Sequence, residues 1–137
     1  MSKFNMSLMR TLVDMGSWIG DPCTYDIYRT KNDVFMPLVV EHVPHNLNGG
    51  YMVAISHYTK QNGDTMFDPM VKIWVRGGSD CIPVSYRNDF TGMNETYVKC
   101  TNGELYINQP EVDSLKKFCN IWARNIKHQG YVMELMA

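Results

Sequence analysis

The sequence predicts an α+β fold in which a twisted antiparallel sheet of five to six strands carries an N-terminal helix and a C-terminal helix packed on one face. Three observations lead to this prediction. Apolar residues recur at helical spacing near the N-terminus, alternate in twos through the middle of the chain, and return to helical spacing near its end.

The N-terminal helix is predicted to begin at Ser7, whose hydroxyl suits the N-cap position. Leu8, Leu12 and Met15 then recur at helical spacing and form an apolar stripe. The segment Gly20-Asp21-Pro22 contains residues that disfavour a helix, so we expect the helix to end before it.

The middle of the chain predicts the strands. Runs rich in β-branched and aromatic residues lie at 25–28, 35–40, 51–58, 71–75, 82–86, 97–100 and 105–107, with turn-forming residues between them. The clearest turn is Asn62-Gly63, because this dipeptide tolerates positive φ at both central positions of a β-hairpin. The nearby Asp64 and Asp68 are able to accept hydrogen bonds from local backbone N–H groups.

The C-terminal helix is predicted to start at Asn108 or Gln109, with Pro110 in its first turn. Its apolar face is expected to lie on the sheet and consists of Val112, Leu115, Phe118, Cys119, Trp122 and Ile126. Gly130 is suited to the left-handed conformation that ends many helices.

Length and composition predict a single globular domain over residues 1–137, with 45% hydrophobic and 20% charged residues. The 13 basic and 14 acidic residues are interspersed, which disfavours direct nucleic-acid binding. Cys23, Cys81, Cys100 and Cys119 are too widely separated for a Cys-x-x-Cys pair, so we expect reduced thiols. Because a signal peptide and a membrane-length apolar run are both lacking, we expect a cytoplasmic protein.

The candidate catalytic residues are His57, Asp64, Asp68 and Asp89. One imidazole with carboxylates would suit a divalent cation or an acid–base pair, as in a hydrolase that uses His57 with Asp64 or Asp68. The favoured alternative is that the two aspartates cap turns while His57 ends a strand with its ring half solvated. On that interpretation the chain has no catalytic residues, no metal site and no cofactor.

Other patterns also favour structural interpretations. His42 and His45 would form part of a metal site only if other segments supplied further ligands. The favoured interpretation is that they lie where the chain leaves a strand and enters a loop. Ser56 precedes His57 in a predicted strand, so alternation points the two side chains to opposite faces. The pairs Gly49-Gly50 and Gly77-Gly78 lack the lysine of a phosphate-binding loop and indicate turns.

Three separated segments resemble, in order, the signature of one family. Residues 51–70 resemble its His-Tyr-x-x-Gln-Asn-Gly-Asp-x-Met-x-Asp-Pro segment, residues 82–92 its Pro-Val-x-Tyr-x-x-Asp-Phe-x-Gly segment, and residues 118–130 its Phe-x-x-x-Trp-x-x-Asn-x-x-x-Gln-Gly ending. This small uncharacterised family occurs in bacteriophages, prophages and conjugative elements, and it has no established reaction. The resemblance covers roughly residues 35–131 and implies an accessory protein of a mobile element. Such proteins often act by binding.

Aromatic residues rimmed by Asn, Asp and Arg are typical of protein interfaces, although the same composition can line a small-ligand pocket. The predicted recognition residues are Tyr58, Gln61, Asn62, Asp64, Asp68, Tyr86, Asn88, Asp89, Phe90 and Asn125.

Three functional hypotheses follow. The leading one is a non-enzymatic phage or mobile-element protein that binds and inhibits a host defence component, such as a CRISPR effector. The second is a small-molecule binder that sequesters a nucleotide-like defence signal, as a homo-oligomer whose interface supplies the pocket. The third is the hydrolase described above.

Overall fold

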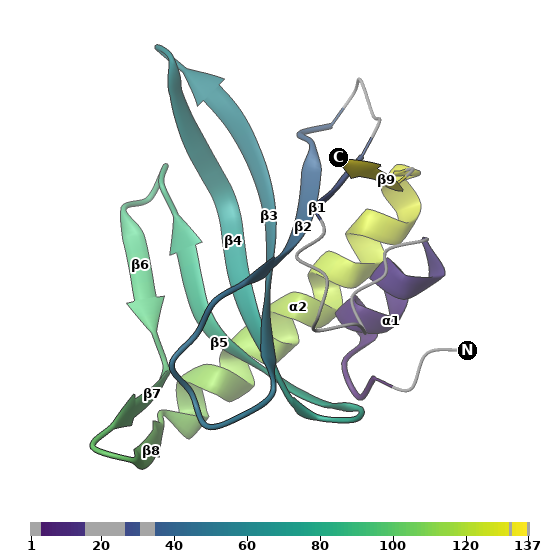
Figure 1. Ribbon diagram of the computed structural model, residues 1–137. Coiled ribbons are helices and arrows are strands. Elements are labelled where there is room, and N and C mark those ends of the chain that lie inside the picture. The colour runs from purple at the N-terminus through teal and green to yellow at the C-terminus, as the bar shows by residue number, and fades with distance from the viewer. Residues whose placement is uncertain (1–3, 16–26, 31–34, 132, 137) are drawn as a thin grey trace.

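A computed structural model describes residues 4–15, 27–30, 35–131 and 133–136 of the chain (Figure 1). Its elements in chain order are α1 (Ser7–Asp14), β1 (Ile27–Thr30), β2 (Leu38–Val43), β3 (Tyr51–Gln61), β4 (Asp64–Gly77), β5 (Asp80–Asn88), β6 (Met93–Thr96), β7 (Val98–Thr101), β8 (Glu104–Ile107), α2 (Gln109–Gln129) and β9 (Met133–Met136). The predicted end of the first helix, at Gly20-Asp21-Pro22, lies outside the described residues.

The described strands form one antiparallel sheet of seven, in the order β6-β5-β4-β3-β2-β1-β9, and a separate two-stranded sheet of β7 and β8. Helix α2 packs on one face of the large sheet and also contacts α1. The predicted α+β class, with an antiparallel sheet and a helix from each end of the chain, is confirmed. The sheet is larger than expected because β6 and β9 were not predicted, while 97–100 and 105–107 form the separate hairpin β7–β8.

The predicted residues are found at both ends of α2, but not at the start of α1. In α2, the Asn108 side chain accepts a hydrogen bond from the Glu111 N–H at 3.4 Å, and Gly130 ends the helix at φ 70°, both as predicted. In α1 the predicted Ser7 cap is wrong, because Met6 occupies the N-cap position. Ser7 is the first helical residue instead, and its hydroxyl donates to Asn120 Oδ1 at 2.9 Å, which joins α1 to α2.

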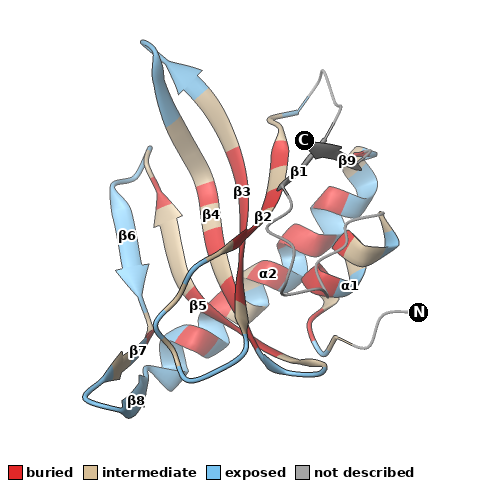
Figure 2. Cartoon of the chain, viewed as in Figure 1, coloured by how far each residue is buried: buried red, intermediate tan, exposed pale blue. Residues whose placement is uncertain are grey.

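The main core lies between the sheet and the two helices. Its fully buried members include Leu8 and Leu12 from α1, Ile55 and Ile73 from the sheet, and Ile126 from α2. Burial of each such side chain is worth about 1.5–3 kcal/mol, so this layer holds the helices on the sheet. Figure 2 shows the buried segments of β2, β3 and β4 together with those of both helices.

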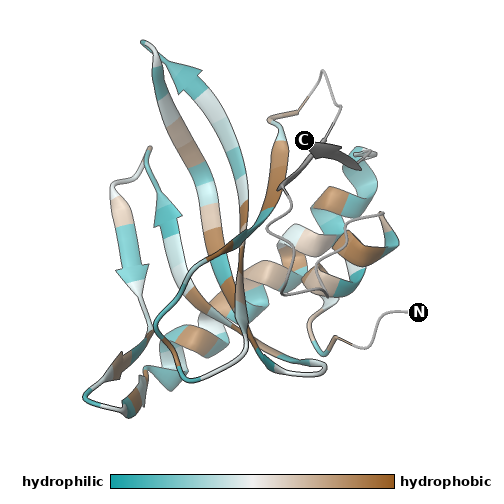
Figure 3. Ribbon diagram, in the orientation of Figure 1, coloured by the Kyte–Doolittle hydropathy of each residue, from teal (hydrophilic) through white to brown (hydrophobic). Residues whose placement is uncertain are grey.

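A second apolar cluster packs at one end of the opposite sheet face, where β7 and the start of α2 meet the sheet. Its members are Met52, Trp74, Ile82, Val84, Val98 and Val112. Trp74 also donates its indole N–H to Gly49 O at 3.0 Å. At the other end of the sheet, β3 and β4 extend as a hairpin whose outer part is exposed and hydrophilic (Figures 2 and 3).

Among the described residues, no helix combines the length and apolar character that a bilayer crossing requires.

Candidate functional site

The candidate residues fall around an irregularity in the pairing of β3 with β4. Ser56 pairs with Met70 and Tyr58 pairs with Phe67, so His57 alone opposes Asp68 and Pro69. This is the geometry of a β-bulge, in which the extra residue bends its strand and changes the direction of the side chains. The Asp68–Pro69 peptide bond at the bulge is cis. Asp68 therefore lies inside a strand, and the prediction that it caps a turn is wrong.

Asn88, at the end of β5, connects the bulge to the β5–β6 turn. Its side-chain N–H donates to Asp68 Oδ1 at 2.7 Å, and its Oδ1 accepts from the N–H groups of Phe90 at 3.0 Å and Thr91 at 3.2 Å. Asn88 is only 8% exposed, so the expectation that its side chain lies on an exposed surface is wrong. Its role is to fix the turn that carries Phe90.

Asp89 fixes the same turn from the other side. Its carboxylate accepts from the Phe67 N–H at 2.9 Å and forms an ion pair with Arg87 at 2.8 Å. The hydrogen bond from the Arg87 side chain, followed by the one from the Phe67 backbone, holds the pKa of Asp89 below its ordinary value. Asp89 thus stays ionised and anchors the β5–β6 turn to β4.

His57 is buried, at 8% exposure, and β3 continues beyond it to Gln61, so the expected half-solvated strand end is wrong. The Trp122 indole N–H donates to His57 Nε2 at 2.8 Å, and His57 Nδ1 lies 3.3 Å from Pro37 O. The neutral ring is therefore protonated at Nδ1, which donates to that carbonyl. Burial lowers the pKa of His57, although the backbone groups of Pro37 and Met36 and, to a smaller extent, the Asp68 carboxylate oppose this change. Both ring nitrogens therefore make contacts within the fold, one with Trp122 of α2 and one with the backbone at Pro37.

The other carboxylate of the hydrolase hypothesis, Asp64, lies at the far end of the hairpin. It is exposed and pairs with Gln61 across the turn. Asn62 and Gly63 have φ of 53° and 86°, which confirms the predicted hairpin turn. The structure thus brings Asp68 near His57 but leaves Asp64 several residues along the strand from it.

Two hairpin ends project from the same end of the sheet (Figure 1). The β3–β4 turn carries the exposed Gln61, Asn62 and Asp64, and the β5–β6 turn carries Phe90, which is 51% exposed. Asn125 is also exposed but lies on α2 instead. The structure therefore places part of the predicted recognition set on two separate hairpin ends and leaves Asn125 on another element.

An open groove of about 420 Å³ crosses the sheet on the face away from the helices. It is lined by Val39, Glu41, Ser56, Tyr58, Lys60, Thr65 and Phe67. Only Tyr58 among them was predicted as a binding residue. The alternation of Ser56, Tyr58 and Lys60 along one strand predicts that they share one face of the sheet. Which residues of β2 and β4 lie beside them depends on the strand register, which the sequence does not give.

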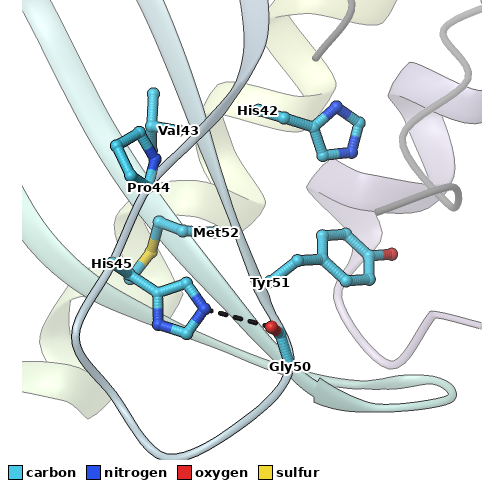
Figure 4. A pocket seen from close by; sticks show the side chains of 7 residues that line it. All are labelled: His42, Val43, Pro44, His45, Gly50, Tyr51 and Met52. Carbon is cyan, nitrogen blue, oxygen red and sulfur yellow. Dashed lines mark hydrogen bonds between the residues drawn. The ribbon is translucent and has the colours of Figure 1, made fainter. Parts of the chain in front are cut away.

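A second pocket, of about 270 Å³, lies where β2 leaves the sheet and β3 enters it (Figure 4). His45 Nε2 lies 3.0 Å from Gly50 O, which closes the loop between the two strands. The rings of His42 and His45 point in different directions in Figure 4, and His42 packs beside Tyr51. Within the described part of the chain, no group of His, Cys, Asp and Glu side chains is arranged to hold a metal ion.

The described thiols that are fully buried are poor nucleophiles. Burial raises the pKa of Cys81 to about 11 and that of Cys119 to about 12. Cys119 packs in the main core, as predicted, and Cys23 lies outside the described residues.

Comparison with known proteins gives a family without an assigned activity. No curated protein and no solved structure matches the chain. A family model described as a domain of unknown function, DUF6908, matches residues 7–132, which include both helices and all but the last of the described strands. The chain therefore belongs to the DUF6908 family.

Proposed function

We propose that this protein is a non-enzymatic binding protein of a phage or mobile element, and that it inhibits a host defence component in the host cytoplasm. The genomic setting rests on the three signature segments of the sequence. The single observation that supports a binding function best is the β5–β6 turn, where Phe90 is 51% exposed on a backbone held by Asn88 and Asp89.

A fixed, exposed aromatic side chain is well suited to bind a protein. Large rigid side chains at the centre of an interface supply much of its binding energy, because little conformational entropy is lost when they are buried. The polar residues Gln61, Asn62 and Asp64 on the neighbouring hairpin end would form the rim that such interfaces have. Both turns are exposed at the same end of the sheet, and the β3–β4 hairpin extends beyond the helices (Figure 1).

The substitution Phe90→Ala tests this proposal. We expect it to weaken binding to a host defence protein by about thirtyfold, which corresponds to about 2 kcal/mol for the loss of an interface hot spot. The measurement is quantitative capture of the tagged protein from lysate of a defence-bearing host, followed by titration with the identified partner. The matched control is Ile121→Ala, because Ile121 is 53% exposed but lies on α2.

Equal binding by the Phe90→Ala and Ile121→Ala variants would place the interface elsewhere on the molecule. A preparation that retains no stoichiometric protein partner would contradict the binding function itself.

The open groove favours a second candidate function, which is binding of a nucleotide-like ligand. Its volume of about 420 Å³ suits a small molecule. Tyr58 and Phe67 pair across β3 and β4, so their rings can contact a base, and the Lys60 ammonium can contact a phosphate. Lys60 donates to Thr65 Oγ1 at 2.9 Å, which places the ammonium at the hairpin end of the groove.

Thermal unfolding with a panel of signalling nucleotides tests the second candidate. At a ligand concentration of about one hundred times Kd, binding adds about 2.7 kcal/mol to the free energy of unfolding. We expect the increase in Tm to be reduced in Lys60→Gln and retained in Lys127→Gln, whose lysine is exposed on α2. If no nucleotide raises the Tm of the unmodified protein, the groove does not serve this purpose.

A further inference from the structure

Strand β6 forms one edge of the large sheet, and all of its residues are exposed. Its inner side pairs with β5, and the Tyr97 N–H that follows it donates inward to Val84 O at 2.7 Å. Since backbone groups in an antiparallel strand alternate between its two sides, the N–H and C=O groups of Asn94 and Thr96 point outward. No described strand pairs with this outer side of β6.

An apolar cleft lies beside this edge, between β6 and α2. It has a volume of about 230 Å³ and is lined by Tyr86, Met93, Tyr97, Glu111, Ser114, Leu115 and Phe118. The rings of Tyr86 and Phe118 meet edge to face at 5.6 Å, which joins the sheet to the helix along the cleft. Met93 at the rim is 44% exposed, so part of the apolar lining remains in contact with solvent.

The cleft has an acidic rim. Glu95 and Glu111 are both exposed. Burial raises the pKa of the Tyr97 hydroxyl, and the nearby carboxylates of Glu111 and Glu95 raise it further. One carboxylate comes from β6 and the other from the first turn of α2. A partner with a positively charged side chain would match this rim, because opposite charges beside an interface favour association.

The same rim disfavours a second copy of this chain at the edge. If two β6 strands paired through the outward groups of Asn94 and Thr96, the symmetry would place the two Glu95 residues directly opposite each other. Like charges in that position are destabilising. The occupant is therefore better sought in a different protein.

We infer that β6 binds an extended segment of a partner protein as an additional strand of the sheet, with an apolar side chain of the segment in the cleft and a lysine or arginine beside Glu95 and Glu111. Backbone hydrogen bonds to Asn94 and Thr96 supply affinity, and the cleft and its rim supply selectivity. This inference rests on the proposed protein-binding function and states how the partner is recognised. The segment binds next to Phe90, because the β5–β6 turn precedes β6 directly.

Designed peptides test this inference. We would use two blocked peptides of about six residues that alternate threonine with valine or leucine, the usual length of a strand. In one peptide the positions two residues before and two residues after the central leucine, which share its face of the strand, are lysines, and in the other they are glutamates. We expect the basic peptide to bind more tightly, and NMR to show that the amide protons of Asn94 and Thr96 become protected from solvent exchange.

Two variants separate the backbone contact from the charge contact. Thr96→Pro removes one outward N–H, and proline is tolerated on an edge strand where its missing N–H would face solvent. We expect this variant to bind the basic peptide about five- to tenfold more weakly than the matched control Thr96→Val, as expected for the loss of one hydrogen bond. We expect Glu95→Lys to bind the acidic peptide in preference to the basic one.

Absence of binding by both peptides, or binding that leaves the Asn94 and Thr96 amides unprotected, would overturn strand addition. Equal affinity of Thr96→Pro and Thr96→Val would do the same. If the peptides fail while partner capture remains sensitive to Phe90→Ala, the protein-binding function stands without strand addition. If the peptides bind while capture finds no protein, the proposed function fails instead.

Discussion

Replacement of Gly50 by alanine is expected to destabilise the protein by about 2–5 kcal/mol. Gly50 lies in the loop between β2 and β3 at φ 66°, and a Cβ atom there would be 2.0 Å from Val75 O. The left-handed conformation costs alanine about 1–2 kcal/mol, and overpacking adds about 1–3 kcal/mol. Because the clashing atom belongs to the backbone of β4, a change of rotamer cannot relieve it.

The neighbouring Gly49 supplies the matched control. It has a similar φ of 76°, but a Cβ atom at this position would meet nothing within 4 Å. Gly49→Ala should therefore lower the free energy of unfolding only by the cost of the left-handed conformation, about 1–2 kcal/mol. Urea unfolding of the two variants measures the difference. Equal midpoints would show that the chain at Val75 moves freely to accept the added methyl group.

The close approach at Gly50 shows what local sequence can and cannot predict. Asn62-Gly63 and Asn108 act on residues within a few positions of themselves, so their roles follow from local chemistry and were predicted. The Gly49-Gly50 pair was predicted as a turn, but the contact with Val75 depends on the register of β3 with β4. Sequence spacing does not determine that register.

The unpredicted strands have a similar explanation. Every residue of β6 is exposed, and its sequence Met-Asn-Glu-Thr lacks the apolar alternation that marks a half-buried strand. Its position follows from pairing with β5 after the turn that Asn88 and Asp89 fix. The cleft beside β6 depends on α2, which comes later in the chain. The sequence of residues 93–96 alone therefore predicts neither the strand nor the cleft.

The candidate site was predicted in part for the same reason. Phe90 was identified because aromatic residues beside Asn and Asp are typical of interfaces. The structural roles of Asn88 and Asp68 were missed because their hydrogen bond joins residues 20 positions apart. The environment of His57 depends on Trp122, which is 65 positions away. Burial of this histidine leads to the second large expected effect.

The free energy of unfolding is expected to decrease as the pH falls below 6.5, because of His57. Burial lowers the pKa of His57 from its ordinary value of 6.5, and the Trp122 N–H already occupies the Nε2 lone pair that would accept the proton. Well above pH 6.5 the ring is neutral in both the native and the unfolded chain, and its contribution is constant. Below it, the unfolded chain binds a proton that the native protein does not.

The free energy of unfolding then decreases by up to about 1.4 kcal/mol per pH unit. This decrease stops once the pH is below the pKa of His57 in the native protein. The matched variant is His57→Gln, whose amide oxygen can accept from Trp122 while its amide N–H donates to Pro37 O without titrating. Urea unfolding between about pH 8 and about pH 5 should show the two proteins diverging below the unfolded-state value. Parallel curves would mean that native His57 accepts a proton as readily as the unfolded chain. In that case the ring would be accessible to solvent, and acid–base chemistry with Asp68 would again be open to test.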